Sequence, residues 1–248
     1  MKKFFNFLIE SNFFISTCAI FIFWFYSIRL KSPIEHSTSL LVFFGTFFSY
    51  QILQNLPKSL NLKSYSIPRI ITMAISLIFC CYGTINLSQF NLAMLFIACT
   101  VLGLYEVILL ENFGLRKIPY AKPLAISFVW TVVSTYLGEK TNLYQSLDCF
   151  LFILFLSIPF DIKDLAFDES QNVKTLPMIL KNKIYPFLGI SYTVYCGISY
   201  NITGELFMLL SPVIYFLLLK YAKRHPNLYY LGFDGLIICR FLLYLFKY

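Results

Sequence analysis

Residues 157–168 read Ser-Ile-Pro-Phe-Asp-Ile-Lys-Asp-Leu-Ala-Phe-Asp, and the tripeptide Thr-Leu-Pro follows at 175–177. The stretch comes directly after an apolar run that is long enough to cross a membrane as a helix. If that helix continues to residue 168, the spacing i, i+3, i+7 places Asp161, Asp164 and Asp168 on one face. Neighbouring carboxylates repel one another unless a cation lies between them, and Mg²⁺ bound through carboxylates and substrate phosphates meets this need. We therefore interpret the three aspartates as metal ligands. The alternative is a solvated acidic turn, which the position at a membrane boundary disfavours.

The composition indicates an integral membrane protein. The 248 residues are 58% hydrophobic and only 13% charged, and the mean hydropathy is +0.71, whereas about 25% of the residues of soluble domains are charged. The seven cysteines lie in apolar runs without metal-ligand spacing, so we expect them to pack as small apolar side chains. The two histidines, His36 and His225, fall in predicted loops, which argues against histidine catalysis.

Nine apolar runs have the length of membrane-crossing helices, because about 17 to 20 residues span the hydrocarbon core. They do not alternate polar and apolar residues, as the strands of a membrane barrel would. We predict an all-α, polytopic helical bundle that forms a single membrane domain over residues 1–248. The predicted helices cover about 12–30, 39–55, 69–87, 91–110, 122–138, 144–160, 184–201, 205–222 and 228–246.

The distribution of positive charge predicts the orientation. Of the 20 Lys and Arg residues, fifteen fall on one side of the membrane if the N-terminus is cytoplasmic, and one, Arg240, lies within the last helix. The other side holds the remaining four: Arg29, Lys31, Lys140 and Lys247. This bias follows the positive-inside rule, so we expect the acidic stretch to face the cytoplasm and the net charge of +8 to serve orientation rather than nucleic-acid binding.

The segment 161–177, with the pattern DxxDxxxD, a short basic stretch and then TLP, resembles the second aspartate-rich motif of the UbiA-type intramembrane prenyltransferase superfamily. The predicted helix count and the position of the motif after the sixth helix also resemble that family. The resemblance implies helices around a central cavity open to the cytoplasmic side. It also implies two aspartate-rich motifs that bind Mg²⁺, and metal ions that hold a prenyl diphosphate.

The first motif of that family has no acidic counterpart in this sequence. It would fall near the end of the second helix, yet no Asp or Glu occurs between His36 and Tyr105. Amides and a lysine stand there instead, namely Gln51, Asn55 and Lys58. The amides can donate hydrogen bonds to phosphate oxygens but cannot replace carboxylates as strong Mg²⁺ ligands.

The resemblance also assigns roles to basic residues near the diphosphate. Arg116, Lys117 and Lys122 match the family's basic loop between the fourth and fifth helices, and Lys174 follows the acidic motif. We expect Lys117 to assist catalysis with Asp164 and Asp168, and the other basic residues to bind phosphate, since fixed positive charge neutralises a leaving diphosphate.

The resemblance implies transfer of a polyprenyl group from a prenyl diphosphate to an aromatic or lipid-type acceptor, in lipid or quinone biosynthesis. The missing first motif leaves an alternative, namely a membrane protein that binds a lipid phosphate or a partner without turnover. A CDP-alcohol phosphotransferase would need DG and AR pairs that are absent around Asp161, and a transporter would show repeated halves.

Two charged residues lie within the last predicted helix. Asp234 and Arg240 are six residues apart and do not share a helix face. We expect each of them to reach the membrane surface along its side chain or to pair with another helix.

Overall fold

The structure, a computed structural model, describes residues 11–53, 67–106, 120–170 and 174–246, and all regular elements in these ranges are helical. The predicted all-α class is therefore confirmed. The elements are α2 (Phe13–Arg29), α3 (His36–Leu53), α4 (Ile67–Thr84), α5 (Gln89–Glu106), α6 (Ala121–Thr131), π-helical η3 (Val132–Tyr136), α7 (Leu143–Lys163), α8 (Leu165–Ser170), α9 (Leu176–Leu180), 3-10 helical η4 (Lys181–Lys183), α10 (Ile184–Thr203), α11 (Leu206–Tyr221), π-helical η5 (Tyr229–Asp234) and α12 (Gly235–Leu245).

Each of the nine predicted apolar runs overlaps a helix in the described residues, and the ends of the runs 39–55 and 91–110 lie outside these residues. Two of the runs contain a π-helical segment joined to an α-helix, η3 after α6 and η5 before α12. His36 is the first residue of α3 rather than a loop residue. The sequence did not predict α8 and α9, the two short helices that lie between α7 and α10.

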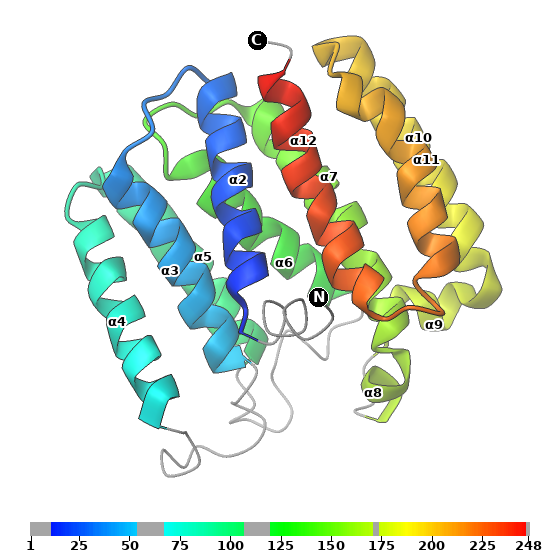
Figure 1. The fold of residues 1–248 in the computed structure, drawn as a ribbon, viewed down its shortest axis with the longest axis horizontal. Coiled ribbons are helices and arrows are strands. Elements are labelled where there is room, and N and C mark those ends of the chain that lie inside the picture. Colours follow the sequence, from blue (N-terminus) through cyan, green and yellow to red (C-terminus); the bar gives the residue numbers. More distant parts are fainter. Residues whose placement is uncertain (1–10, 54–66, 107–119, 171–173, 247–248) are drawn as a thin grey trace.

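The helices follow one another around the molecule (Figure 1). α2 and α12 lie side by side in the middle of the view, with α3 and α4 on one side and α11 and α10 on the other. Behind them α6 packs on both α5 and α7, and α7 also contacts α10. α3 and α4 approach closely at Gly83, because a Cβ atom there would lie 2.5 Å from the Cβ atom of Leu41.

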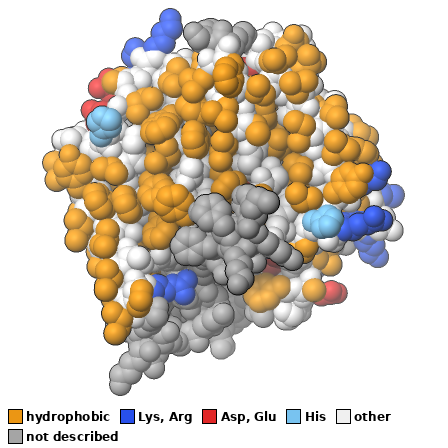
Figure 2. Space-filling model, in the orientation of Figure 1, with side chains coloured by type: hydrophobic (Ala, Val, Ile, Leu, Met, Phe, Trp, Pro, Cys, Tyr) orange, Lys and Arg blue, Asp and Glu red, His pale blue; other side chains and the backbone are white. Residues whose placement is uncertain are grey.

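The outer surface of this arrangement is apolar. Figure 2 shows hydrophobic side chains over most of the face, with charged side chains toward its edges. Large apolar residues are exposed on several helices, including Ile67 (74%), Phe96 (73%) and Val213 (66%). Two described helices, α4 and α7, are both long and apolar enough to cross a membrane, and α2, α11 and Gln89–Leu104 of α5 are shorter apolar helices.

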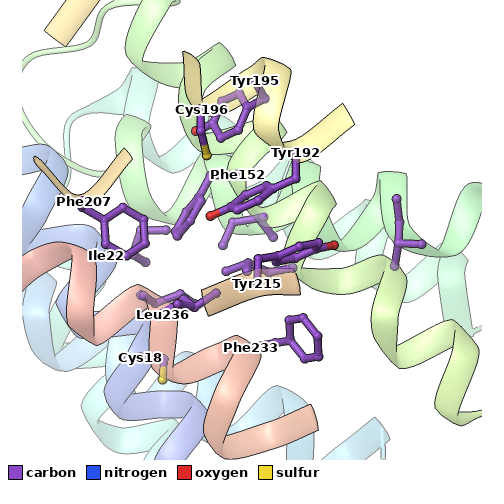
Figure 3. Packing of buried hydrophobic residues seen from close by; sticks show 14 of the residues in the cluster. Cys18, Ile22, Phe152, Tyr192, Tyr195, Cys196, Phe207, Tyr215, Phe233 and Leu236 are labelled. Carbon is purple, nitrogen blue, oxygen red and sulfur yellow. The ribbon is translucent and has the colours of Figure 1, made fainter. Parts of the chain in front are cut away.

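The main core is aromatic and joins α2, α7, α10, α11 and α12. Tyr192 and Tyr215 stack with ring centroids 4.1 Å apart, and Phe152 meets Phe207 edge to face (Figure 3). The Tyr192 hydroxyl donates to Ser211, and the Tyr215 hydroxyl donates to a backbone carbonyl of α7. Buried phenols are satisfied in this way, so the aromatic core fixes the spacing of the helices that carry the site.

A buried ionic network lies at the end of α7 opposite the acidic stretch. Arg240 of α12 contacts Asp148 of α7 (Nη2–Oδ2 2.6 Å) and Glu205 beside α11 (Nε–Oε2 3.0 Å). Arg29 of α2 completes the network, 2.8 Å from Glu205 and 3.2 Å from Asp148. Asp148 also accepts hydrogen bonds from the hydroxyls of Tyr26, Tyr195 and Ser199. Of the two expectations for Arg240, pairing with residues on other helices is therefore the one that the structure shows.

Candidate functional site

The three aspartates of the acidic stretch surround one lysine. The Nζ atom of Lys122 lies 3.0 Å from Asp161 Oδ1, 3.5 Å from Asp164 Oδ2 and 3.2 Å from Asp168 Oδ2. The side chains of Asp161 and Asp168 are almost fully buried, whereas that of Asp164 is 35% exposed. The predicted convergence of the three carboxylates is therefore present, and the cation between them is an ammonium group.

Local helix geometry produces this convergence. α7 ends at Lys163 and α8 begins at Leu165, but the backbone N–H of Asp168 still donates to the carbonyl of Asp164. The three carboxylates therefore keep nearly helical spacing across the junction. Lys122 lies in the first turn of α6, which packs on α7 and brings the ammonium to the acidic face.

A second lysine borders the cluster. Lys163 pairs with Asp164 (Nζ–Oδ1 3.2 Å) and donates a hydrogen bond to the hydroxyl of Tyr230 in η5. Its ammonium also lies 4.4 Å from the centre of the Tyr230 ring. Three carboxylates and two lysines leave this group with an excess of negative charge, which favours a further cation.

The residues fit a magnesium ion only together with other oxygen ligands. In the described part of the chain, no group of three or more His, Cys, Asp or Glu side chains is placed to hold a metal ion. However, Mg²⁺ commonly takes one or two carboxylates and completes its shell with water and substrate phosphates. Asp161 Oδ2 is buried and has no hydrogen-bond partner among the described residues, so one ligand oxygen is available for such an ion.

A cavity of about 440 Å³ opens beside the cluster. Its polar wall includes Lys122, Lys163 and Asp164, and the remainder is mostly apolar and aromatic, with Trp130 and Phe160. A neighbouring cavity of about 180 Å³ is almost wholly apolar. Both cavities are lined by Tyr50, Ile126 and Trp130. Together they suit an elongated amphipathic ligand with an anionic head and an apolar tail.

Two other residues predicted to bind phosphate are not among the described residues that line either cavity. Gln51 is buried and hydrogen-bonds Thr72 of α4 (3.3 Å), and its neighbour Tyr50 lines the cavity instead. Lys174 is exposed, before the start of α9. The remaining predicted residues lie outside the described ranges: Asn55, Lys58, Arg116 and Lys117.

The sequence interpretation missed several cavity residues. Lys163 lies within the acidic motif, and the sequence gives no sign of its partner Tyr230, which is 67 residues further along the chain. Asp234, which the sequence indicates only as an intramembrane carboxylate, lines the same cavity. The rarity of charge in this chain is the signal that could have singled out Asp234.

No protein-family model matches the sequence, and none of the curated proteins is detectably similar to it. Solved structures do match the fold. A UbiA homologue from Aeropyrum pernix K1 has a TM-score of 0.63 at 11% identity, covering 95% of this chain and 98% of that one. A UbiA homologue from Archaeoglobus fulgidus, bound to GPP and Mg²⁺, has a TM-score of 0.61 at 11% identity, covering 96% and 97%.

A third match is a digeranylgeranylglyceryl phosphate synthase, with a TM-score of 0.52 at 18% identity, covering 99% of this chain and 97% of that one. Each match extends over nearly the whole length of both compared chains, so the similarity concerns the complete helical arrangement rather than one pair of helices. The chain therefore has the fold of the UbiA homologues.

Proposed function

We propose that this chain is an integral membrane prenyltransferase that binds a prenyl diphosphate and transfers its prenyl group to an acceptor. One observation carries the proposal: the largely buried cluster of Lys122 and three aspartates adjoins a cavity whose other walls are mostly apolar and aromatic. The fold supports it, because the Archaeoglobus fulgidus homologue of the same fold was solved with GPP and Mg²⁺. The exposed apolar residues of α4, α10 and α11 support contact with lipid. In this proposal the nine predicted helices cross the membrane, and the aspartate cluster faces the cytoplasm.

The chain's own residues have distinct parts in this reaction. Lys122 and Lys163 provide fixed positive charge for the diphosphate oxygens as the bond between carbon and oxygen breaks. Trp130, Ile126 and the apolar cavity beyond them hold the prenyl chain and keep water away from the carbocation. Among the aromatic residues that line the cavity, Trp130 would stabilise positive charge on the allylic carbon.

Asp161, Asp164 and Asp168 would hold Mg²⁺ together with the diphosphate. When bound, the ion would neutralise charge on the leaving group. The carboxylates would then exchange their contact with Lys122 for the ion, which frees the ammonium for phosphate oxygens.

The direct test is pyrophosphate release by the purified chain in lipid nanodiscs, with geranyl diphosphate as the probe. We expect release in the presence of Mg²⁺ and its loss after chelation with EDTA, because the carboxylates need a divalent cation to hold the diphosphate. Binding of the probe without release would contradict transfer. Absence of both binding and release would contradict any role in prenyl diphosphate chemistry.

A second candidate function is binding of a lipid phosphate without turnover. Two observations favour it: Lys122 already contacts all three carboxylates, and no Asp or Glu occurs between His36 and Tyr105 to supply a second metal site. Such a protein would hold the phosphate through lysines alone. Its affinity for geranyl diphosphate would then be the same with Mg²⁺ and with EDTA.

The stability of the variant Lys122→Met, measured with and without Mg²⁺, distinguishes the two candidate functions. The variant leaves three carboxylates without their shared cation, so in EDTA we expect its free energy of unfolding to fall by about 1–3 kcal/mol. If the carboxylates bind Mg²⁺, added Mg²⁺ should raise the melting temperature of Lys122→Met more than that of the unmodified protein, because the ion takes the place of the ammonium. Thermal unfolding in nanodiscs measures both effects.

Lys174→Met is the matched control, because it removes the same charge from an exposed lysine outside the cluster. Its melting temperature should respond to Mg²⁺ as the unmodified protein does. An equal response of all three proteins would count against a magnesium site at the aspartates.

A further inference from the structure

Five basic side chains gather where the start of α10 meets the end of α11, and we call them the basic patch. The ammonium of Lys223 lies over the ring of Tyr185, 3.9 Å from its centre, so the two helix ends are in direct contact. The other four basic residues are no more than four residues away from one of these two along the chain. Figure 2 shows Lys and Arg side chains at the edge of the molecule where α11 ends in Figure 1. All five side chains are exposed: Lys181, Lys183, Lys220, Lys223 and Arg224.

No acidic side chain of this part of the chain balances the basic patch. Between Lys174 and Phe233 the one acidic residue is Glu205, which lies at the opposite end of α11 and pairs with Arg240. Within the ranges that the structure describes, none of the five basic side chains forms an ion pair. Neighbouring charges of one sign repel one another, and an anion beside them removes that cost. The basic patch is therefore complementary to an anionic ligand.

The surface next to the basic patch is apolar and suits acyl chains. Phe187 and Ile190 are exposed in the first turns of α10, directly after the patch. Val213 and Leu217 are exposed in the last turns of α11, directly before it. A phospholipid presents the matching order of features, an anionic headgroup followed by apolar chains. Charge and apolar surface together thus favour an anionic lipid over a small anion in solution.

We infer that the basic patch binds the headgroup of an anionic phospholipid, whose acyl chains lie on the exposed apolar residues of α10 and α11. The inference goes beyond the proposed prenyl transfer and shares only its membrane setting. The positive-inside rule accounts for basic residues at this end of the bundle, but it does not require five of them to converge on one contact between two helices. Lys and Arg donate charge-assisted hydrogen bonds to the phosphate oxygens of such a headgroup.

The basic patch adjoins the segment that leads from α11 to the candidate site. Backbone hydrogen bonds close consecutive turns between Tyr221 and Tyr229, so the connection from α11 to η5 is continuous. η5 then carries Tyr230, whose hydroxyl accepts a hydrogen bond from Lys163. A lipid bound at the patch holds the start of this connection in its folded form. We therefore expect lipid binding to raise the melting temperature of the protein.

The test compares phosphatidylglycerol with phosphatidylcholine of the same acyl chains, so the probes differ in the net charge of the headgroup. Native mass spectrometry of the detergent-purified protein measures the affinity for each lipid. We expect the unmodified protein to prefer phosphatidylglycerol. The variant Lys183→Gln/Arg224→Gln should lose about twentyfold in affinity for phosphatidylglycerol and keep its affinity for phosphatidylcholine, because each Lys or Arg near an anionic lipid contributes roughly fivefold.

Lys31→Gln/Lys140→Gln is the matched control, because it removes two exposed positive charges at the opposite end of the bundle, beside the end of α2 and the start of α7. It should keep the preference for phosphatidylglycerol. In nanodiscs, phosphatidylglycerol should raise the melting temperature of the unmodified protein and of this control, but not that of Lys183→Gln/Arg224→Gln.

Three results would overturn the inference: equal affinity of the unmodified protein for the two lipids, an equal loss in both double variants, or displacement of phosphatidylglycerol by inorganic phosphate at equal concentration. The last result would assign the basic patch to a soluble phosphate rather than to a lipid. None of these assays contains a prenyl diphosphate, so failure of pyrophosphate release would refute prenyl transfer without affecting them.

Discussion

Replacing Arg240 by methionine is expected to lower the free energy of unfolding by about 3–5 kcal/mol, since removing one partner of a buried ion pair leaves its carboxylates uncompensated. Arg240 is 2% exposed and contacts both Asp148 and Glu205. Its guanidinium carbon also lies over the rings of Phe25 and Phe152, at 4.5 and 4.7 Å from their centres. Methionine keeps the apolar volume but removes the charge and the donors. Unfolding by denaturant in detergent micelles measures the difference.

The double variant Arg240→Met/Glu205→Gln separates charge balance from packing. The network holds two arginines and two carboxylates, so the single variant leaves one excess negative charge and the double variant leaves none. We expect the double variant to be more stable than Arg240→Met alone. Glu139→Gln, an exposed carboxylate at the same end of α7, should change stability little. A double variant less stable than both single variants would show that the individual hydrogen bonds, and not the charge balance, maintain the network.

The helices were predictable because each is specified locally. An apolar run long enough to cross a membrane leaves its backbone no partner other than itself, so it forms a helix wherever it lies. The acidic face was also predictable, because Asp161, Asp164 and Asp168 keep nearly helical spacing across the junction of α7 and α8. The short helices α8 and α9 were not predicted, because neither has a long apolar run.

The interaction partners of Lys122 and Arg240 could not be predicted, because they depend on how the helices pack. Lys122 reaches the aspartates only because α6 lies against α7, and the sequence alone assigned that lysine to a phosphate. Arg240 and Asp148 are 92 residues apart in the sequence. The predicted role of Gln51 at the diphosphate stays a prediction; the packing of α3 on α4 gives it a hydrogen bond with Thr72, and the preceding residue lines the cavity. Successive residues of a helix differ in direction by about 100°, so the sequence alone does not show which of Tyr50 and Gln51 faces the cavity.

Replacing Asp168 by asparagine is expected to reduce pyrophosphate release from geranyl diphosphate by at least about a hundredfold, a loss typical of removing one group that stabilises transition-state charge. Asp168 is fully buried and lies 3.2 Å from Lys122, so its charge acts in a medium of low dielectric constant. Asparagine has nearly the same shape, so packing around the side chain is retained while the ligand charge is lost. Release is measured in nanodiscs, and isothermal titration with Mg²⁺ in the presence of a non-hydrolysable diphosphate analogue measures binding.

Glu169→Gln removes an identical charge one residue further along α8, from an exposed position, and should retain full release. Asp164→Asn should have a smaller effect than Asp168→Asn, because its side chain is 35% exposed and water can replace one of its contacts. Weaker Mg²⁺ binding together with lost release would support a metal role for Asp168. Lost release with unchanged Mg²⁺ binding would assign Asp168 to holding Lys122 in place, and undiminished release would refute its part in the reaction.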